Sequence, residues 1–167
     1  MTRSKLVAAA LLAAACDGPP AAPGGGTGTS GGRTRYASGS LAITRPDSSQ
    51  VRIAIDDCWS GQMLSFYGVE VFDTDHVERR LRVVEDPVDG TRLVLVGLVP
   101  SRPRIVVEPG ACTRLESRIE MANSSLNDIR SLRGRVAAEC ALPDGAGRLS
   151  ADVTLLDCSF DNRVRGP

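Results

Sequence analysis

Alternation of apolar and polar residues is the main pattern in the chain after about residue 36. The segments VRIAID (51–56), RLRVVED (80–86) and RLSADVTLL (148–156) place apolar residues at every second position, and RLVLVGLV (92–99) is a continuous apolar run. A period of two predicts strands with one buried face, and a short continuous run predicts a strand buried on both faces. These segments therefore predict β-structure.

Three further strands are predicted at residues 104–108, 114–121 and 134–140, again from apolar residues in phase. Turn signals rich in Pro, Asp, Gly and Ser separate the strands, and no ten-residue stretch has a helical period. Short strands between regular turns are typical of sandwiches and barrels. We therefore expect an all-β fold, an antiparallel β-sandwich or barrel-like domain stabilised by disulfides.

One pattern occurs twice. VRIAIDDC (51–58) and ADVTLLDC (151–158) share Asp-Cys and the same apolar phase when they are aligned on the cysteine. Each follows a turn and an earlier strand that opens on a glycine, Gly39 or Gly134. An internal duplication is one hypothesis for this echo, and it requires the two hairpins to occupy related places in the fold.

The N-terminus has a different pattern. Arg3 and Lys5 precede a ten-residue apolar run, Leu6 to Ala15. This is the plan of a bacterial secretion signal, and the run is shorter than the roughly 20 residues that a membrane-spanning helix needs. Residues 1–15 are therefore predicted to be a signal peptide.

Ala14, Ala15 and Cys16 resemble the cleavage motif of bacterial lipoproteins, although Ala13 stands where leucine is usual. The resemblance covers residues 1–16 only. It implies that Cys16 is lipidated and becomes the new N-terminus, with the membrane as a partner through its lipid. The alternative is ordinary secretion, because Ala13 and Ala15 also satisfy the A-x-A rule for cleavage at the same bond.

The segment after Cys16 is rich in Gly, Pro, Ala, Thr and Ser, a composition typical of a flexible tether. We expect residues 16–35 to be a lipid-anchored tether, residues 36–162 a single β-rich domain, and residues 163–167 a disordered tail. This organisation predicts a bacterial cell-envelope lipoprotein facing the periplasm or the cell exterior.

Four of the five cysteines remain once Cys16 is set aside, and an even number in an exported domain predicts two disulfides. A hairpin turning near Leu126 would place Cys112 opposite Cys140. The turn after Cys140 would leave Cys158 at the far end of the next strand, beyond the roughly 7 Å that a bridge can span. The predicted pairs are therefore Cys112–Cys140 and Cys58–Cys158.

Charge and motifs give little support for catalysis. The chain has 20 basic and 20 acidic residues and no basic patch with interleaved aromatics, so nucleic acid is not an expected partner. Its single histidine, His76, could form a metal or acid–base cluster with Asp73 or Asp75 in a small hydrolase or metal-dependent enzyme. The favoured alternative takes Asp75 and Glu78 as a helix capping box, with His76 exposed in the first turn.

Two acidic loops, EDPVDG (85–90) and LPDG (142–145), contain oxygen ligands of the kind that calcium uses. Asp-Gly is first of all a turn signal. No cofactor is therefore predicted, with calcium as the alternative.

Four of the six aromatic residues lie in one stretch, residues 58–72. The favoured interpretation is that Trp59, Phe66, Tyr67 and Phe72 fill the core beside a disulfide at Cys58. The alternative is a binding patch formed by Trp59 and Tyr67, since such residues anchor interfaces, with another envelope protein or a carbohydrate as its partner.

These observations favour a non-catalytic binding or structural module of the envelope. The alternatives are an accessory subunit of an envelope complex and the small enzyme built on His76.

Overall fold

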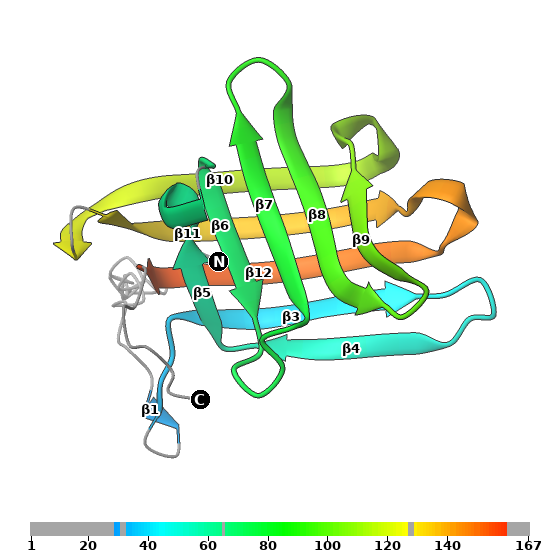
Figure 1. The fold of residues 1–167 in the computed structure, drawn as a ribbon, viewed down its shortest axis with the longest axis horizontal. Helices are drawn as coiled ribbons and strands as arrows, with labels where there is room; N and C mark the ends of the chain where they lie inside the picture. The colour runs from blue at the N-terminus through cyan, green and yellow to red at the C-terminus, as the bar shows by residue number, and fades with distance from the viewer. Residues whose placement is uncertain (1–28, 31–32, 65, 127–128, 160–167) are drawn as a thin grey trace, which may run out of the picture.

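The computed structural model describes residues 29–30, 33–64, 66–126 and 129–159, and Figure 1 shows an all-β fold. Two five-stranded antiparallel sheets pack against each other, and a separate two-stranded sheet precedes them. The strands of the two large sheets cross at a steep angle (Figure 1). The predicted fold class is confirmed.

The first large sheet contains, in spatial order, β10 (Cys112–Leu126), β11 (Ile129–Ala141), β12 (Arg148–Cys158), β3 (Ala37–Thr44) and β4 (Gln50–Ile55). The second contains β5 (Asp57–Ser60), β6 (Gly68–Phe72), β7 (Arg80–Asp86), β8 (Gly90–Val99) and β9 (Arg102–Val107). The small sheet pairs β1 (Thr29–Ser30) with β2 (Arg33–Thr34), so part of the segment 16–35 forms a minimal ladder. Three 3-10 turns complete the described elements: η1 (Gly61–Leu64), η2 (Pro109–Ala111) and η3 (Pro143–Gly145).

Successive strands pair with each other almost throughout. The chain passes from the first sheet to the second at Asp56 and returns through η2, and β12 then pairs with β3. Asp56 fixes the first crossing, because its carboxylate accepts hydrogen bonds from the Thr74 backbone N–H (2.9 Å) and hydroxyl (2.7 Å). The crossing is thereby tied to the loop between β6 and β7.

The main core lies between the two sheets, where each strand contributes every second residue. On β6, Val69 and Val71 are buried there, and they lie directly opposite Val83 and Leu81 of β7. Because side chains alternate across a strand, Glu70 between them must point to the outer face of the second sheet.

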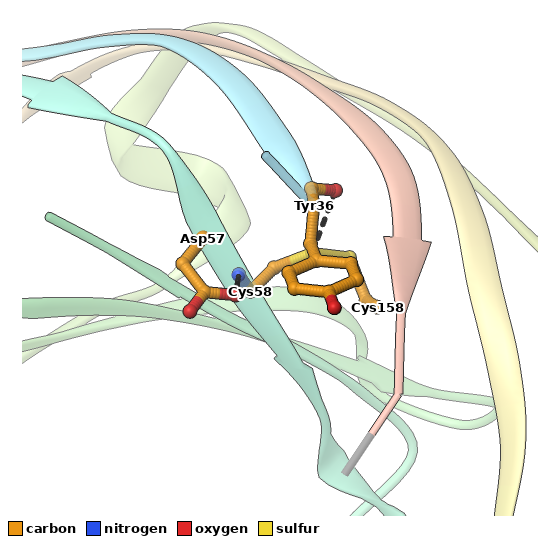
Figure 2. The surroundings of a disulfide bond; sticks show 4 residues. All are labelled: Tyr36, Asp57, Cys58 and Cys158. Carbon is orange, nitrogen blue, oxygen red and sulfur yellow. Dashed lines mark hydrogen bonds between the residues drawn. A yellow bond between two sulfur atoms is a disulfide. The ribbon is translucent and has the colours of Figure 1, made fainter. Parts of the chain in front are cut away.

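The disulfides join Cys58 to Cys158 and Cys112 to Cys140, the same pairs that the sequence predicts. Cys112 and Cys140 are register partners on β10 and β11, as expected for a hairpin that turns after Leu126. The other bridge joins the two sheets, β5 to β12. Figure 2 shows its surroundings: Cys58 Sγ lies 3.2 Å from the Tyr36 carbonyl oxygen, and the Cys58 N–H donates to the Asp57 carboxylate at 2.7 Å.

The two hairpins that share the sequence echo occupy equivalent places. β11–β12 and β3–β4 lie side by side in the first sheet. Gly39 faces Ile55 and Gly134 faces Leu155, three residues before Cys58 and Cys158 respectively. The φ values are +138° at Gly39 and +141° at Gly134, a region that only glycine adopts readily. The condition that the duplication hypothesis requires is therefore met.

The aromatic stretch differs from its favoured interpretation. Residues 57–60 and 68–72 form β5 and β6, strands that the apolar pattern did not identify. Phe72 is fully buried and Trp59 is half-buried, but neither belongs to the main core cluster between the sheets. They occupy alternate positions that face away from it, so their rings pack on the outer face of the second sheet.

No helix begins at Asp75, so the capping-box interpretation is wrong. Residues 73–79 form two consecutive turns, in which the Asp73 carbonyl accepts from the His76 N–H and the His76 carbonyl accepts from the Arg79 N–H, each at 2.9 Å. β6 ends at Phe72 and β7 begins at Arg80, so these turns make up the connection between the two strands.

Candidate functional site

The outer face of the second sheet is the candidate site, and strand register defines its composition. One row of directly paired residues crosses all five strands: Trp59, Glu70, Arg82, Val94 and Val106. The next row contains Asp57, Phe72, Arg80, Val96 and Arg104, and a third contains Gly68, Val84 and Arg92. Paired side chains on one face of a sheet lie within contact distance. The face therefore combines arginines with valines and aromatic rings, and we refer to these three rows as the arginine face.

Glu70 is the centre of this face and is fully buried, with 0% of its surface exposed. Arg82 donates to Glu70 Oε1 from Nε at 2.8 Å and from Nη2 at 2.6 Å. Arg80 Nη1 lies 3.3 Å from Glu70 Oε2. A carboxylate without access to water needs such charged partners, so Glu70 holds both guanidinium groups near the sheet.

Aromatic rings cover the guanidinium groups. The Arg82 guanidinium carbon lies 4.6 Å from the centroid of the Phe66 ring, and that of Arg80 lies 5.8 Å from the Trp59 ring. Trp59 also meets Phe72 edge to face, with centroids 4.5 Å apart. Cation–π contacts of this kind fix the orientation of arginine side chains.

Arg80 has one unsatisfied donor. Its Nε is buried and has no hydrogen-bond partner among the described residues. Buried N–H groups are usually paired, so this donor is an exception within the buried part of the face.

Arg104 and Arg92 occupy the side of the face farther from Glu70. Arg104 is exposed and has no ion pair among the described residues. Arg92 Nη2 lies 3.8 Å from Asp86 Oδ2, at the limit of an ion pair. Two cationic groups are thus available on this side of the face.

The outer face of the first sheet has a different composition. Three of its exposed arginines pair with acidic neighbours: Arg114 with Glu116 at 2.9 Å, Arg135 with Asp152 at 2.8 Å, and Arg133 with Glu120 at 3.8 Å. Arg118 is also exposed there and has no ion pair among the described residues. The hydrogen bonds from Arg114 and Arg135 lower the pKa values of Glu116 and Asp152 below their usual range. Charged side chains of both signs alternate on this face, as is typical of a solvated surface.

The histidine loop lies outside the arginine face. His76 is exposed, and its Nδ1 lies 3.5 Å from Glu78 Oε1. In the part of the chain that the structure describes, no three His, Cys, Asp or Glu side chains come together as a metal site.

The two acidic loops use their carboxylates in turns and ion pairs. Asp86 accepts from the backbone N–H groups of Val88 and Asp89 at 2.8 and 3.1 Å, and the hydrogen bond from Asp89 is the main cause of its lowered pKa. Asp144 pairs with Arg102 at 2.8 Å and so joins η3 to β9.

Beside this pair is an open hollow of about 430 Å³ between the β3–β4 turn, the β8–β9 turn and Ala146.

The residues singled out in the sequence are only partly brought together. Trp59 lies on the arginine face and is half-buried. Tyr67 is 39% exposed, but it precedes β6, which begins at Gly68, and it is not part of the three rows. Binding by either residue stays a prediction. Cys16, the predicted lipidation site, lies outside the described residues.

Sequence reasoning missed Glu70 and the arginines around it. A search for a basic patch in consecutive residues finds none, because these arginines lie on three different strands and meet only through pairing. The sequence signal for them is the alternation within each strand. Arg80, Arg82, Arg92 and Arg104 all stand at positions whose side chains point away from the core.

Fold and site together define an all-β protein of two disulfide-linked sheets, one of which has an outer face where arginines lie among valines and aromatic rings. Comparison with protein-family models, with curated proteins and with solved structures found no match to the chain. Among the described residues, no helix is both long and apolar enough to cross a bilayer.

Proposed function

We propose that this protein is an exported, lipid-anchored envelope protein and that its β-sandwich is a non-catalytic binding module. Two disulfides support an oxidising, extracytoplasmic location, since such bridges persist there and are rare in the cytosol. Lipidation of Cys16 would hold the sandwich near a membrane, and residues 17–35 would set its distance from that membrane.

One observation carries the binding role: the two outer faces of the sandwich differ. The outer face of an antiparallel sheet is normally solvated and polar, as it is on the first sheet. The second sheet places valines and aromatic rings there instead, and two of its arginines lie against those rings. Such a mixed surface, with arginine and aromatic residues together, is typical of the centre of a protein interface.

Fractionation of cells tests the anchor. We expect the wild-type protein in the membrane fraction and the Cys16→Ser variant in the soluble fraction, because a serine cannot receive the thioether-linked lipid. The control variant Ser30→Ala, which alters the same segment, should remain with the membranes. A Cys16→Ser variant that stays in the membrane fraction would contradict the lipid anchor.

A further inference from the structure

We propose that the arginine face docks an acidic segment of a partner protein, with Arg92 and Arg104 pairing its carboxylates and Val96 and Val106 contacting its apolar side chains. This inference rests on the proposed binding function and names the chemistry of the partner. It makes the protein a subunit of an assembly rather than a receptor for a small molecule.

Charge is the first argument. The face contains four arginines, Arg80, Arg82, Arg92 and Arg104, and two buried carboxylates, Glu70 and Asp57. Asp86 adds a third negative charge at the edge, 3.8 Å from Arg92. The exposed Arg104, which has no ion pair among the described residues, and the loosely paired Arg92 carry the positive charge that an acidic surface can reach. Arginine binds carboxylates in a two-pronged geometry that favours specific docking.

Preorganisation is the second argument. Glu70 and the rings of Trp59 and Phe66 hold Arg80 and Arg82 in place, so the centre of the face is rigid before a partner arrives. Side chains that are already ordered lose less conformational entropy on binding. Val106 is 41% exposed beside this rigid centre, and it provides apolar area that a partner can cover.

The composition argues against other occupants. Two copies of the chain packed through this face would bring like charges together. Binding to an anionic membrane would bury little apolar surface. Val94 is only 4% exposed, and among the large hydrophobic residues of this face only Val106 is exposed and not half-buried or buried. Sugars stack on aromatic rings, but Trp59 and Phe66 each already contact a guanidinium group.

The test measures binding of a dye-labelled, soluble glutamate–alanine copolymer by fluorescence anisotropy. The protein is the oxidised mature chain with Cys16→Ser, so the result does not depend on lipidation and can fail separately from the fractionation experiment. Arg104→Glu is compared with Arg118→Glu, because Arg118 is also an exposed mid-strand arginine but lies on the outer face of the first sheet. Circular dichroism verifies that both variants fold.

We expect saturable binding that weakens as salt is raised. Arg104→Glu should weaken it about tenfold or more, the effect of reversing one charge in a close pair, and Arg118→Glu should leave it unchanged. The proposal is overturned by absence of saturable binding, by equal losses in the two variants, or by tighter binding to phosphatidylglycerol vesicles or dextran sulfate at equal charge concentration.

Discussion

Arg82 donates two hydrogen bonds to a single oxygen of Glu70, at 2.8 and 2.6 Å, on the side of a sheet that faces away from the core. The Glu70 side chain is nevertheless as inaccessible to water as the core valines beside it. The outer face of the second sheet is thus a small ordered layer of its own, and its stability depends on this carboxylate.

Replacing Glu70 with glutamine should therefore destabilise the protein. Glu70→Gln keeps the shape of the side chain but leaves Arg80 and Arg82 without their buried counter-ion, a change that costs about 3 kcal/mol when a buried pair is broken. Urea unfolding followed by the emission of Trp59, the single tryptophan, measures the loss. Glu120→Gln is the control, since Glu120 and Arg133 form an exposed pair; equal stability of the two variants would mean that Glu70 has no special role.

The two disulfides should contribute unequally to the free energy of unfolding. Cys58–Cys158 closes a loop of 100 residues and Cys112–Cys140 a loop of 28. By loop-closure entropy the first restricts the unfolded chain by about 4.7 kcal/mol and the second by about 3.6 kcal/mol. Unfolding of the two paired Cys→Ala variants should show the larger loss for Cys58/Cys158. A larger loss for Cys112/Cys140 would show that native-state contacts, rather than loop length, dominate.

Gly134 should not tolerate a side chain. Its φ is +141°, and a Cβ there would lie 1.8 Å from the Arg118 carbonyl oxygen. Gly134→Ala should cost about 2 kcal/mol or more, measured by thermal unfolding. Gly110→Ala is the matched control because a Cβ at Gly110 meets no atom within 4 Å. If both variants were equally stable, the close approach of β10 and β11 at Gly134 would be disproved.

Stability should fall in acid partly through Asp152. The hydrogen bond from Arg135 lowers the pKa of Asp152 in the folded protein. Its contribution is therefore fully present above the unfolded-state value of about 4 and is lost as the pH falls through the lower folded-state pKa. Asp152→Asn should flatten the decline of unfolding free energy below about pH 4, and added salt should shrink the difference from wild type. If Asp152→Asn left the pH dependence of the unfolding free energy in acid unchanged, the role given to the Arg135–Asp152 hydrogen bond would be wrong.

Much of the fold follows from local periodicity. The alternation in residues 51–56, 80–86 and 148–156 corresponds to β4, β7 and β12. Cys112 and Cys140 are equidistant from the turn near Leu126, and this symmetry placed them opposite each other. Both results depend only on the period of two and the rise of a strand.

The parts that were not predicted depend on longer-range geometry. The strands β5 and β6 are short and carry aromatic rings on their outward side. Their apolar residues therefore point to both faces of the sheet, and the alternation that marks a strand is lost. Glu70 meets Arg82 only through the register of β6 with β7, which no single segment encodes. The apparent capping box at Asp75 matched a local motif, but residues 73–79 form two turns that connect β6 to β7.

The most direct test of the central proposal is the intact mass of the mature protein from native membranes, measured after free thiols are blocked without reduction. The account predicts a chain that begins at Cys16, carries acyl groups and has no blocked thiols, since Cys58, Cys112, Cys140 and Cys158 are all paired. A chain that begins at Cys16 without lipid, or one with blocked thiols at these four positions, would contradict an exported, lipid-anchored sandwich.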